Sequence, residues 1–266
     1  MPVKRPFISK DPLGKSVRSA RKVLGGRVKG KMQEKFESPP PDSPPMSPIV
    51  TLIVGREHRL FVAHEHLLCR SPFFTAMLRD QFVENAMNMA VVLPEEEPEI
   101  LSSVLEFLYK GDYFPRLLRS KDANCWELEI TQDVHILGGS GSSKATIFHS
   151  GVGGVVLRDT AVYCAAEKYG LDDLKRLALR KQGLQSGIPV DVILRSARYA
   201  YDNTLDSEYR LRAHYLAMII RTRRIFKGSG TMQFEMETGH PFFFDLFVAM
   251  CNHMDDLEEI SSSRMI

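Results

Sequence analysis

A run of six prolines in eleven residues, SPPPDSPPMSP at 38–48, constrains the fold of this chain more than any other feature. Each proline fixes φ and removes a backbone donor, so the run can form neither a helix nor a central strand. It therefore predicts an extended linker, with the folded part of the chain beginning at about Ile49. We expect residues 1–48 to form a disordered, basic and proline-rich tail.

The charge differs on the two sides of this linker. Residues 1–37 contain 11 Lys/Arg and 3 Asp/Glu, whereas the rest of the chain contains 24 and 30, which gives net charges of +8 and −6. A basic arm of this kind can bind nucleic acid, an acidic protein face, an anionic lipid surface or a nuclear-import receptor. The alternative is a solvated tail that only aids solubility.

The composition is typical of a soluble globular protein, with 44% hydrophobic and 26% charged residues. No segment approaches the roughly 18 consecutive apolar residues of a membrane helix, and no apolar block follows Met1 as in a secretory signal. The cysteines form no C-x-x-C pair, which favours reduced thiols. We expect an intracellular protein of the cytoplasm or nucleus. The cysteines are Cys69, Cys125, Cys164 and Cys251.

The hydrophobic pattern after the linker predicts an α+β fold. Segments rich in β-branched residues predict strands at 49–55, 58–63 and 88–94. Helical spacing predicts helices at 64–69, 72–79 and 96–111, with Ser71 capping the second. Residues 113–157 predict two or three short strands around a glycine- and serine-rich loop. Further helices are expected at 158–169 (with Asp159 as a cap), 171–182, 188–203, 207–226 and 241–260.

The stretch FVAHEHLLCRSPFF at 61–74 raises the question of a metal site or a catalytic thiol. His64 and His66 are two residues apart, whereas helix-borne ligands need a spacing of three or four to share a face. Cys69 follows two leucines, where a thiol is normally inert core. The stretch therefore favours core packing over chemistry. The expected structural core residues are Phe61, His64, Leu67, Leu68, Phe73 and Phe74.

Two other segments imitate functional motifs. GGSGSSKA at 138–145 resembles a phosphate-binding loop, but Ser143 precedes the lysine where that motif needs glycine, and Ala145 follows it where Ser or Thr is needed. The acidic run Glu95–Glu97 is interpreted as a solvated helix start, where carboxylates favour the helix dipole. No catalytic, cofactor-binding or metal-ligating set can be identified from the spacing, and no cofactor is expected.

Residues 49–111 resemble the BTB/POZ domain family. The resemblance is carried by IVTLIVG, HRLFVAHEHLLCRSPFF, MLRDQFVEN and MAVVLPEEEPEILSSVLEFLYKGDY, in the strand–strand–helix–helix–strand–helix order of the family core. DTAVYCAAEKYGLDDLKRLA at 159–178 is similar to the family's final helix pair. The resemblance implies a BTB/POZ domain at 49–182 with an insertion at about 113–157. Residues 188–260 would form a helical extension, as in fungal BTB-domain proteins.

The resemblance also implies a non-enzymatic protein-interaction module that can self-associate and binds protein partners but no membrane. Many members are scaffolds or substrate adaptors of cullin-type ubiquitin ligases, and they carry a hydrophobic-x-Glu element after the second helix. Phe82, Val83 and Glu84 occupy that place and form the candidate cullin contact. The alternative function is a nuclear or chromatin-associated factor that binds nucleic acid through the basic arm.

This sequence departs from the family pattern in two places. The acidic residue that usually pairs with the histidine at position 64 is replaced by Ile49, so we expect His64 to be neutral and to have another hydrogen-bond partner. The helix that members exchange between dimer partners is replaced by the proline run. We therefore expect the swapped dimer to be absent or altered.

Overall fold

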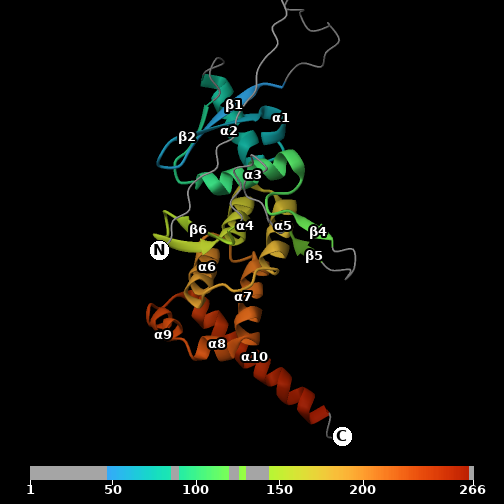
Figure 1. Ribbon diagram of the computed structural model, residues 1–266, viewed down its shortest axis with the longest axis vertical. Helices are drawn as coiled ribbons and strands as arrows, with labels where there is room; N and C mark the ends of the chain where they lie inside the picture. Colours follow the sequence, from blue (N-terminus) through green and yellow to red (C-terminus); the bar gives the residue numbers. More distant parts are fainter. Residues whose placement is uncertain (1–46, 85–89, 120–125, 130–143, 264–266) are drawn as a thin grey trace, which may run out of the picture. The chain divides into compact units, whose positions relative to one another are not determined.

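The first sheet arises from the three segments rich in β-branched residues (Figure 1). In the computed structural model, which describes residues 47–84, 90–119, 126–129 and 144–263, β1 (Ile49–Val54) is the central strand. It pairs antiparallel with β2 (Arg59–His64) and parallel with β3 (Ala90–Leu93). Gly55, at φ 72°, makes the turn toward β2 in a backbone conformation that favours glycine. Residues 1–46, and with them most of the expected tail, lie outside the described part of the chain.

Three helices accompany this sheet: α1 (Glu65–Leu68), α2 (Pro72–Glu84) and α3 (Pro98–Lys110). Helix α2 begins at Pro72 as predicted, but it continues to Glu84, beyond the predicted end at residue 79. Gly111 ends α3 in the left-handed conformation, at φ 76°. The apolar positions of α3 at helical spacing are all buried, which fixes this helix in the core.

Residues 113–157, the expected insertion, form two short hairpins in their described part. β4 (Leu117–Arg119) pairs with β5 (Trp126–Leu128), and β6 (Thr146–His149) pairs with β7 (Gly154–Leu157). Most of the predicted glycine- and serine-rich loop falls in 130–143, outside the described residues.

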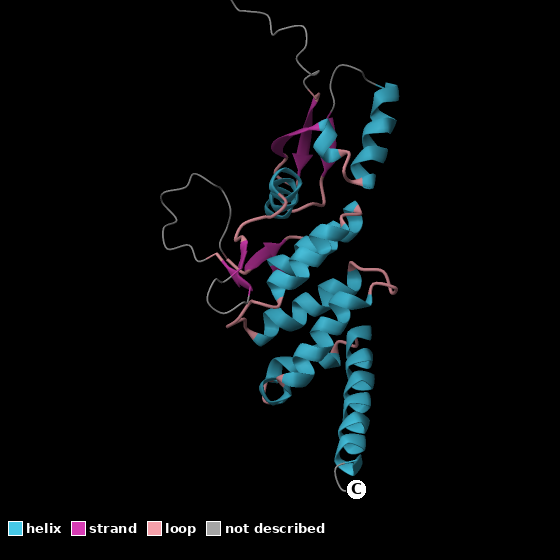
Figure 2. Cartoon of the chain, turned by 90° about the vertical axis from the view of Figure 1, so that its right-hand side faces the viewer, coloured by secondary structure: helices cyan, strands magenta, loops and turns pink. Residues whose placement is uncertain are grey.

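The rest of the described chain is helical (Figure 2). The predicted helix at 207–226 is divided at Thr222, whose backbone angles, φ −104° and ψ 21°, leave the helical region. A short helix around residue 233 was not predicted, because the glycines that flank it lower helix propensity. The seven helices are α4 (Arg158–Tyr169), α5 (Asp172–Gln182), α6 (Val190–Asp202), α7 (Tyr209–Arg221), α8 (Arg223–Lys227), α9 (Gly230–Glu237) and α10 (Pro241–Ser263).

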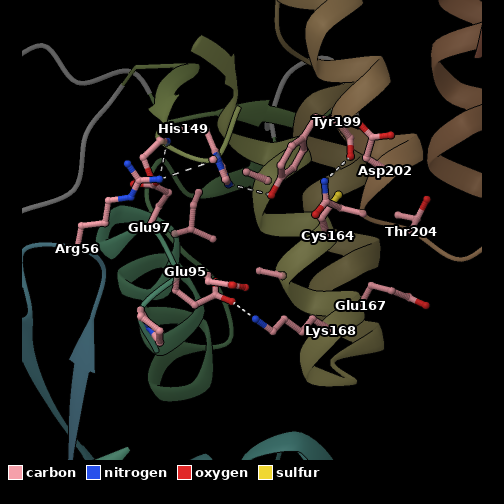
Figure 3. A pocket seen from close by; sticks show the side chains of 18 of the residues that line it. Arg56, Glu95, Glu97, His149, Cys164, Glu167, Lys168, Tyr199, Asp202 and Thr204 are labelled. Atoms are coloured by element: carbon pink, nitrogen blue, oxygen red, sulfur yellow. Dashed lines mark hydrogen bonds and ion pairs between the residues drawn. The ribbon is translucent and has the colours of Figure 1, made fainter. Parts of the chain in front are cut away.

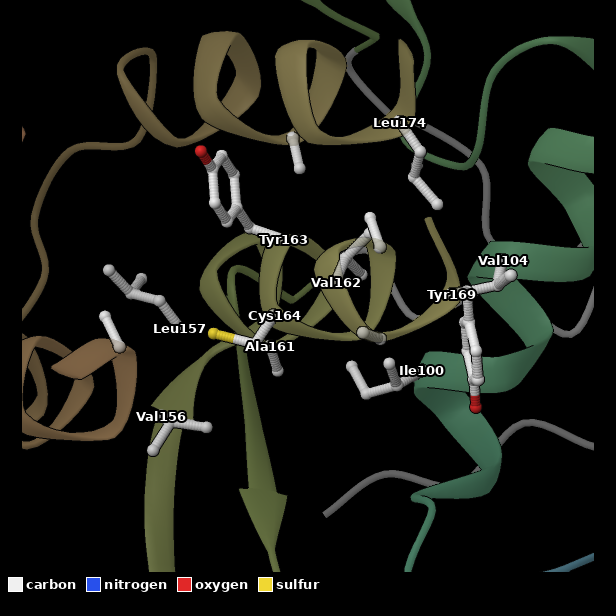
Figure 4. Packing of buried hydrophobic residues seen from close by; sticks show 14 of the residues in the cluster. Ile100, Val104, Val156, Leu157, Ala161, Val162, Tyr163, Cys164, Tyr169 and Leu174 are labelled. Carbon is white, nitrogen blue, oxygen red and sulfur yellow. The ribbon is translucent and has the colours of Figure 1, made fainter. Parts of the chain in front are cut away.

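Helix α4 is buried on nearly all sides. Figure 4 shows it between Ile100 and Val104 of α3, Val156 of β7, and Leu174 of α5. A helix that is buried around its circumference belongs to the interior rather than to a surface layer. Accordingly, one hydrophobic cluster runs from Val50 in β1 to Leu246 in α10. No helix within the described ranges is long and apolar enough to cross a membrane.

The predicted cap of α4 is wrong. Leu157 occupies the cap position, and Asp159 lies within the first turn, where it is 1% exposed. The Tyr113 hydroxyl and the Gln185 side-chain amide each donate a hydrogen bond to its carboxylate, both at 2.9 Å. A buried carboxylate needs such donors, so tertiary partners rather than local helix chemistry determine the position of Asp159.

Candidate protein-interaction site

The surface side of the first sheet carries a contiguous group of aliphatic side chains. Because directly paired residues point to the same side of a sheet, the pairings Ile53–Leu60, Ile53–Val92 and Thr51–Val62 bring residues of all three strands together on this side. We call this surface the outer sheet face. Its strongly exposed members are Ile49 (60%), Leu60 (70%), Val62 (67%) and Val92 (49%).

Single exposed aliphatic residues are ordinary on a protein surface, but neighbouring ones on one face are not. The alternating residues Val50, Leu52 and Val54 of β1 are fully buried, so the strand presents apolar side chains on both of its faces. A strand that is apolar on both faces is typical of a sheet that is covered on both sides. The outer sheet face is therefore a candidate surface for a protein partner.

His64 lies at the rim of this face. Its backbone N–H donates to the Tyr109 hydroxyl oxygen at 3.0 Å, and its Nδ1 lies 2.7 Å from the same oxygen. A hydroxyl oxygen can accept two hydrogen bonds or accept one and donate its own proton, so either group can be the donor of the bond between Nδ1 and Tyr109. Tyr109 thus supplies a hydrogen-bond partner, and Ile49 pairs directly with His64 in the sheet.

The stretch around His64 does not assemble a metal site. The backbone N–H of His66 donates to Ser47 at 3.2 Å, and the described residues contain no group of three or more His, Cys, Asp or Glu that could hold an ion. The expected burial of Cys69 is wrong, because its thiol is exposed. Cys69 closes the single turn of α1, and a helix this short leaves its C-cap at the surface.

The predicted core residues of this stretch are buried to different degrees. Leu68 and Phe74 are completely buried, and Phe61 and Phe73 are partly buried and pack against the hydrophobic cluster. Leu67 is half-buried. The Ser71 hydroxyl donates to the Tyr169 carbonyl at 2.6 Å and accepts from Phe74 N–H at 3.4 Å, so it connects the start of α2 to the end of α4.

The candidate cullin contact closes helix α2. Phe82, Val83 and Glu84 form the last three positions of this helix, and strand β3 begins at Ala90. Their side chains lie outside the described part of the structure. The element thus lies at the end of the second helix rather than after it, because α2 continues to Glu84, and its role remains a prediction.

A buried polar network connects the end of α3 to helices α4 and α5. Lys181 is completely buried, and its ammonium group donates to the Asp112 carboxylate at 2.5 Å and to the carbonyls of Tyr113 and, at 2.8 Å, Pro115. Burial lowers the pKa of Lys181, and the ion pair with Asp112 opposes that change. The sequence showed Lys181 only as one of the basic residues at a helix end, so its structural role was missed.

A pocket of about 770 Å³ lies between the start of α3, the β6–β7 turn, α4 and α6 (Figure 3). Glu96 pairs with Lys168 at 2.5 Å, and Glu97 accepts hydrogen bonds from the backbone and hydroxyl of Ser150. The interpretation of the acidic run as a solvated helix start is therefore incomplete, because two of its carboxylates connect α3 to α4 and to the insertion. The acidic residues that line the pocket are Glu95, Glu96, Glu97, Glu167 and Asp202.

His149 forms one wall of the pocket. Its Nε2 lies 3.1 Å from the Tyr199 hydroxyl, and its Nδ1 lies 3.9 Å from the Glu97 carboxylate. Burial lowers the pKa of His149, although Glu97 and Glu96 act in the opposite direction. Burial and the charge of Arg221 likewise lower the pKa of His214 in α7.

These two histidines predict a pH-dependent stability. A group whose pKa is depressed in the folded state binds its proton better in the unfolded state, so its stabilising contribution is complete above the ordinary value of 6.5 and is lost as the pH falls below it. We expect the free energy of unfolding to decrease between about pH 7 and pH 5. The decrease should be smaller in a His149→Gln/His214→Gln variant. Urea titrations at several pH values across this range measure the decrease in the free energy of unfolding. An equal decrease in the variant and the wild type would contradict the assignment.

A small mixed sheet with three accompanying helices and an apolar outer face gives this part of the chain an α+β architecture. Residues 50–125 match the family model of the BTB/POZ domain, so the chain contains a BTB/POZ domain. A search of the curated proteins gave no match. The matched residues include the first sheet apart from Ile49, helices α1 to α3 and the candidate cullin contact.

Proposed function

We propose that this protein is a scaffold or substrate adaptor that binds one partner through the outer sheet face and a cullin-type ubiquitin ligase through the end of α2. The observation that carries the proposal is the outer sheet face itself. Aliphatic side chains on three neighbouring strands are not covered by the described part of the chain, and a partner that covered them would remove apolar area from water. The BTB/POZ domain is a protein-interaction module, which agrees with this role.

The cullin contact is supported by sequence and position. Phe82, Val83 and Glu84 have the hydrophobic-x-Glu pattern of adaptor members and end the helix that precedes β3, within the matched residues. A hydrophobic anchor flanked by a carboxylate can combine apolar burial with a charged hydrogen bond at one small contact. Because this contact lies on α2, the outer sheet face remains available for a second partner.

Binding of a purified cullin N-terminal domain to the full chain tests this contact. We expect a Phe82→Ala/Glu84→Ala variant to bind at least about tenfold more weakly by calorimetry, since loss of an interface anchor costs about 2 kcal/mol. Arg224→Ala, an exposed position on α8, is the matched control and should bind as the wild type does. Circular dichroism melting verifies that both variants fold.

Two results would contradict the proposed contact. If the wild-type chain binds the cullin and the double variant binds equally well, the contact lies elsewhere. If the wild-type chain does not bind, the cullin role is wrong, whereas the proposal for the outer sheet face is unaffected because it concerns a different surface.

A further inference from the structure

Helix α10 continues beyond the other helices of the extension, as Figures 1 and 2 both show. The buried residues of this 23-residue helix are Phe242, Phe243 and Leu246, all near its start. From Phe247 onward, its large apolar side chains are exposed by 38 to 65%. The first part of α10 thus anchors the helix in the domain, and the second part presents apolar residues that nothing in the described chain covers.

Four of the exposed large apolar residues of α10 follow the spacing of a coiled coil. Phe247, Met250, Met254 and Leu257 are separated by three, four and three residues, which corresponds to the a, d, a and d positions of a heptad repeat. Buried Phe243 occupies the preceding d position, so the row of residues begins in the domain core. We call the four exposed residues the α10 seam. Phe244 at an e position and Ile260 at a g position flank this row, whereas Val248 at a b position lies outside it.

The charges of α10 are compatible with a second copy of the same helix. Asp255, Asp256 and Glu259 fall at the b, c and f positions, which face away from a coiled-coil partner. His253 falls at g, and Glu258 falls at the e position of the next heptad. In a parallel pair these two positions of opposite helices meet, and imidazole and carboxylate are complementary. An antiparallel pair would not bring them together, because it places e beside e and g beside g.

We propose that α10 pairs with α10 of a second copy of this chain as a short parallel coiled coil along the α10 seam. Two heptads give a modest interface. Isolated helices of about 12–15 residues are marginal in water, so a pair this short would ordinarily also have to stabilise the helices themselves. In this protein the helix is already ordered by its anchored start, so pairing does not have to supply the cost of helix formation. The inference is independent of the proposed cullin contact, which lies on α2.

Disulfide trapping tests both the partner and the orientation. In a background in which Cys69, Cys125 and Cys251 are replaced by serine, Met254→Cys or Leu257→Cys places one thiol in the seam, and Glu259→Cys places it on the opposite side. Only a parallel pair brings each seam cysteine next to its own copy, within the short Cα distance that a disulfide needs. With oxidised glutathione, we expect both seam variants to form covalent dimers roughly tenfold faster than Glu259→Cys.

Equal rates in all three variants would indicate random collision and would overturn the proposal. So would the absence of dimers, which would mean that something other than a second copy covers the seam. If a cysteine variant fails to fold, sedimentation of the wild-type chain and of Met254→Glu/Leu257→Glu replaces the test. Self-association that is lost in the glutamate variant supports the pairing. Wild-type monomers, or equal association of both proteins, overturn it.

Discussion

Replacing Lys181 with methionine should lower the free energy of unfolding by about 3–5 kcal/mol, the usual cost of removing one partner of a buried ion pair. Methionine fits the space of the lysine stem, but it cannot donate to the Asp112 carboxylate or to the carbonyls of Tyr113 and Pro115. These acceptors would remain in or near the interior without the Lys181 ammonium group. Leaving them without this donor costs more free energy of unfolding than the loss of the attraction itself. The effect is large because Lys181 serves three acceptors at once.

Lys110→Met is the matched control for this experiment. Lys110 also pairs with a carboxylate, Glu106, at 2.8 Å, but its side chain is more than half exposed. Exposed pairs of this kind contribute about 0.3–0.5 kcal/mol. Urea unfolding of both variants measures the difference. A Lys181→Met variant as stable as Lys110→Met would show that the network does not hold α5 to the end of α3.

The second large effect is expected at Phe74. This ring is completely buried, its centroid lies 4.9 Å from that of Tyr169 in a stacked arrangement, and Tyr169 ends helix α4. Phe74→Ala should lower the free energy of unfolding by about 3–5 kcal/mol, because truncation of a buried aromatic leaves a cavity. Phe244→Ala, at an exposed position of α10, should change it by no more than about 0.5 kcal/mol.

This variant also tests the proposed domain boundaries. If residues 49–182 form one domain across the insertion, the lost contact between α2 and α4 should increase amide hydrogen exchange in both helices together. Exchange that increases in α2 and leaves α4 unchanged would indicate that the two segments unfold separately. The proposed division between this domain and the extension at 188–260 would then need revision.

The order of strands and helices could be predicted because it depends on local patterns. A continuous run of apolar and mostly β-branched residues specifies β1, and apolar residues at helical spacing specify α3. The turn at Gly55 and the end of α3 at Gly111 follow from the conformations that glycine permits. Where local signals were weaker, the predictions failed, as in the division of the helix at Thr222 and the short helix α9.

The polar connections could not be predicted, because each joins residues far apart in the chain. Lys181 meets Asp112 across 69 positions, and Glu97 meets Ser150 across 53. No spacing rule relates such pairs. From the sequence alone, Glu97 was therefore interpreted as part of a solvated helix start and Asp159 as a helix cap. The outer sheet face could not be predicted either, because a strand with apolar residues on both faces has the same sequence pattern as a strand that is buried on both faces.

The most direct test of the central claim is quantitative affinity purification from native cells with the outer sheet face altered. We expect Leu60→Asp/Val62→Asp to lose the protein partners that the wild-type chain recovers, because each aspartate would have to be desolvated in the contact. Ile225→Asp/Phe234→Asp, at positions of similar exposure on α8 and α9, is the matched control and should retain them. Equal loss in both variants, or full recovery with the altered sheet face, would contradict the account.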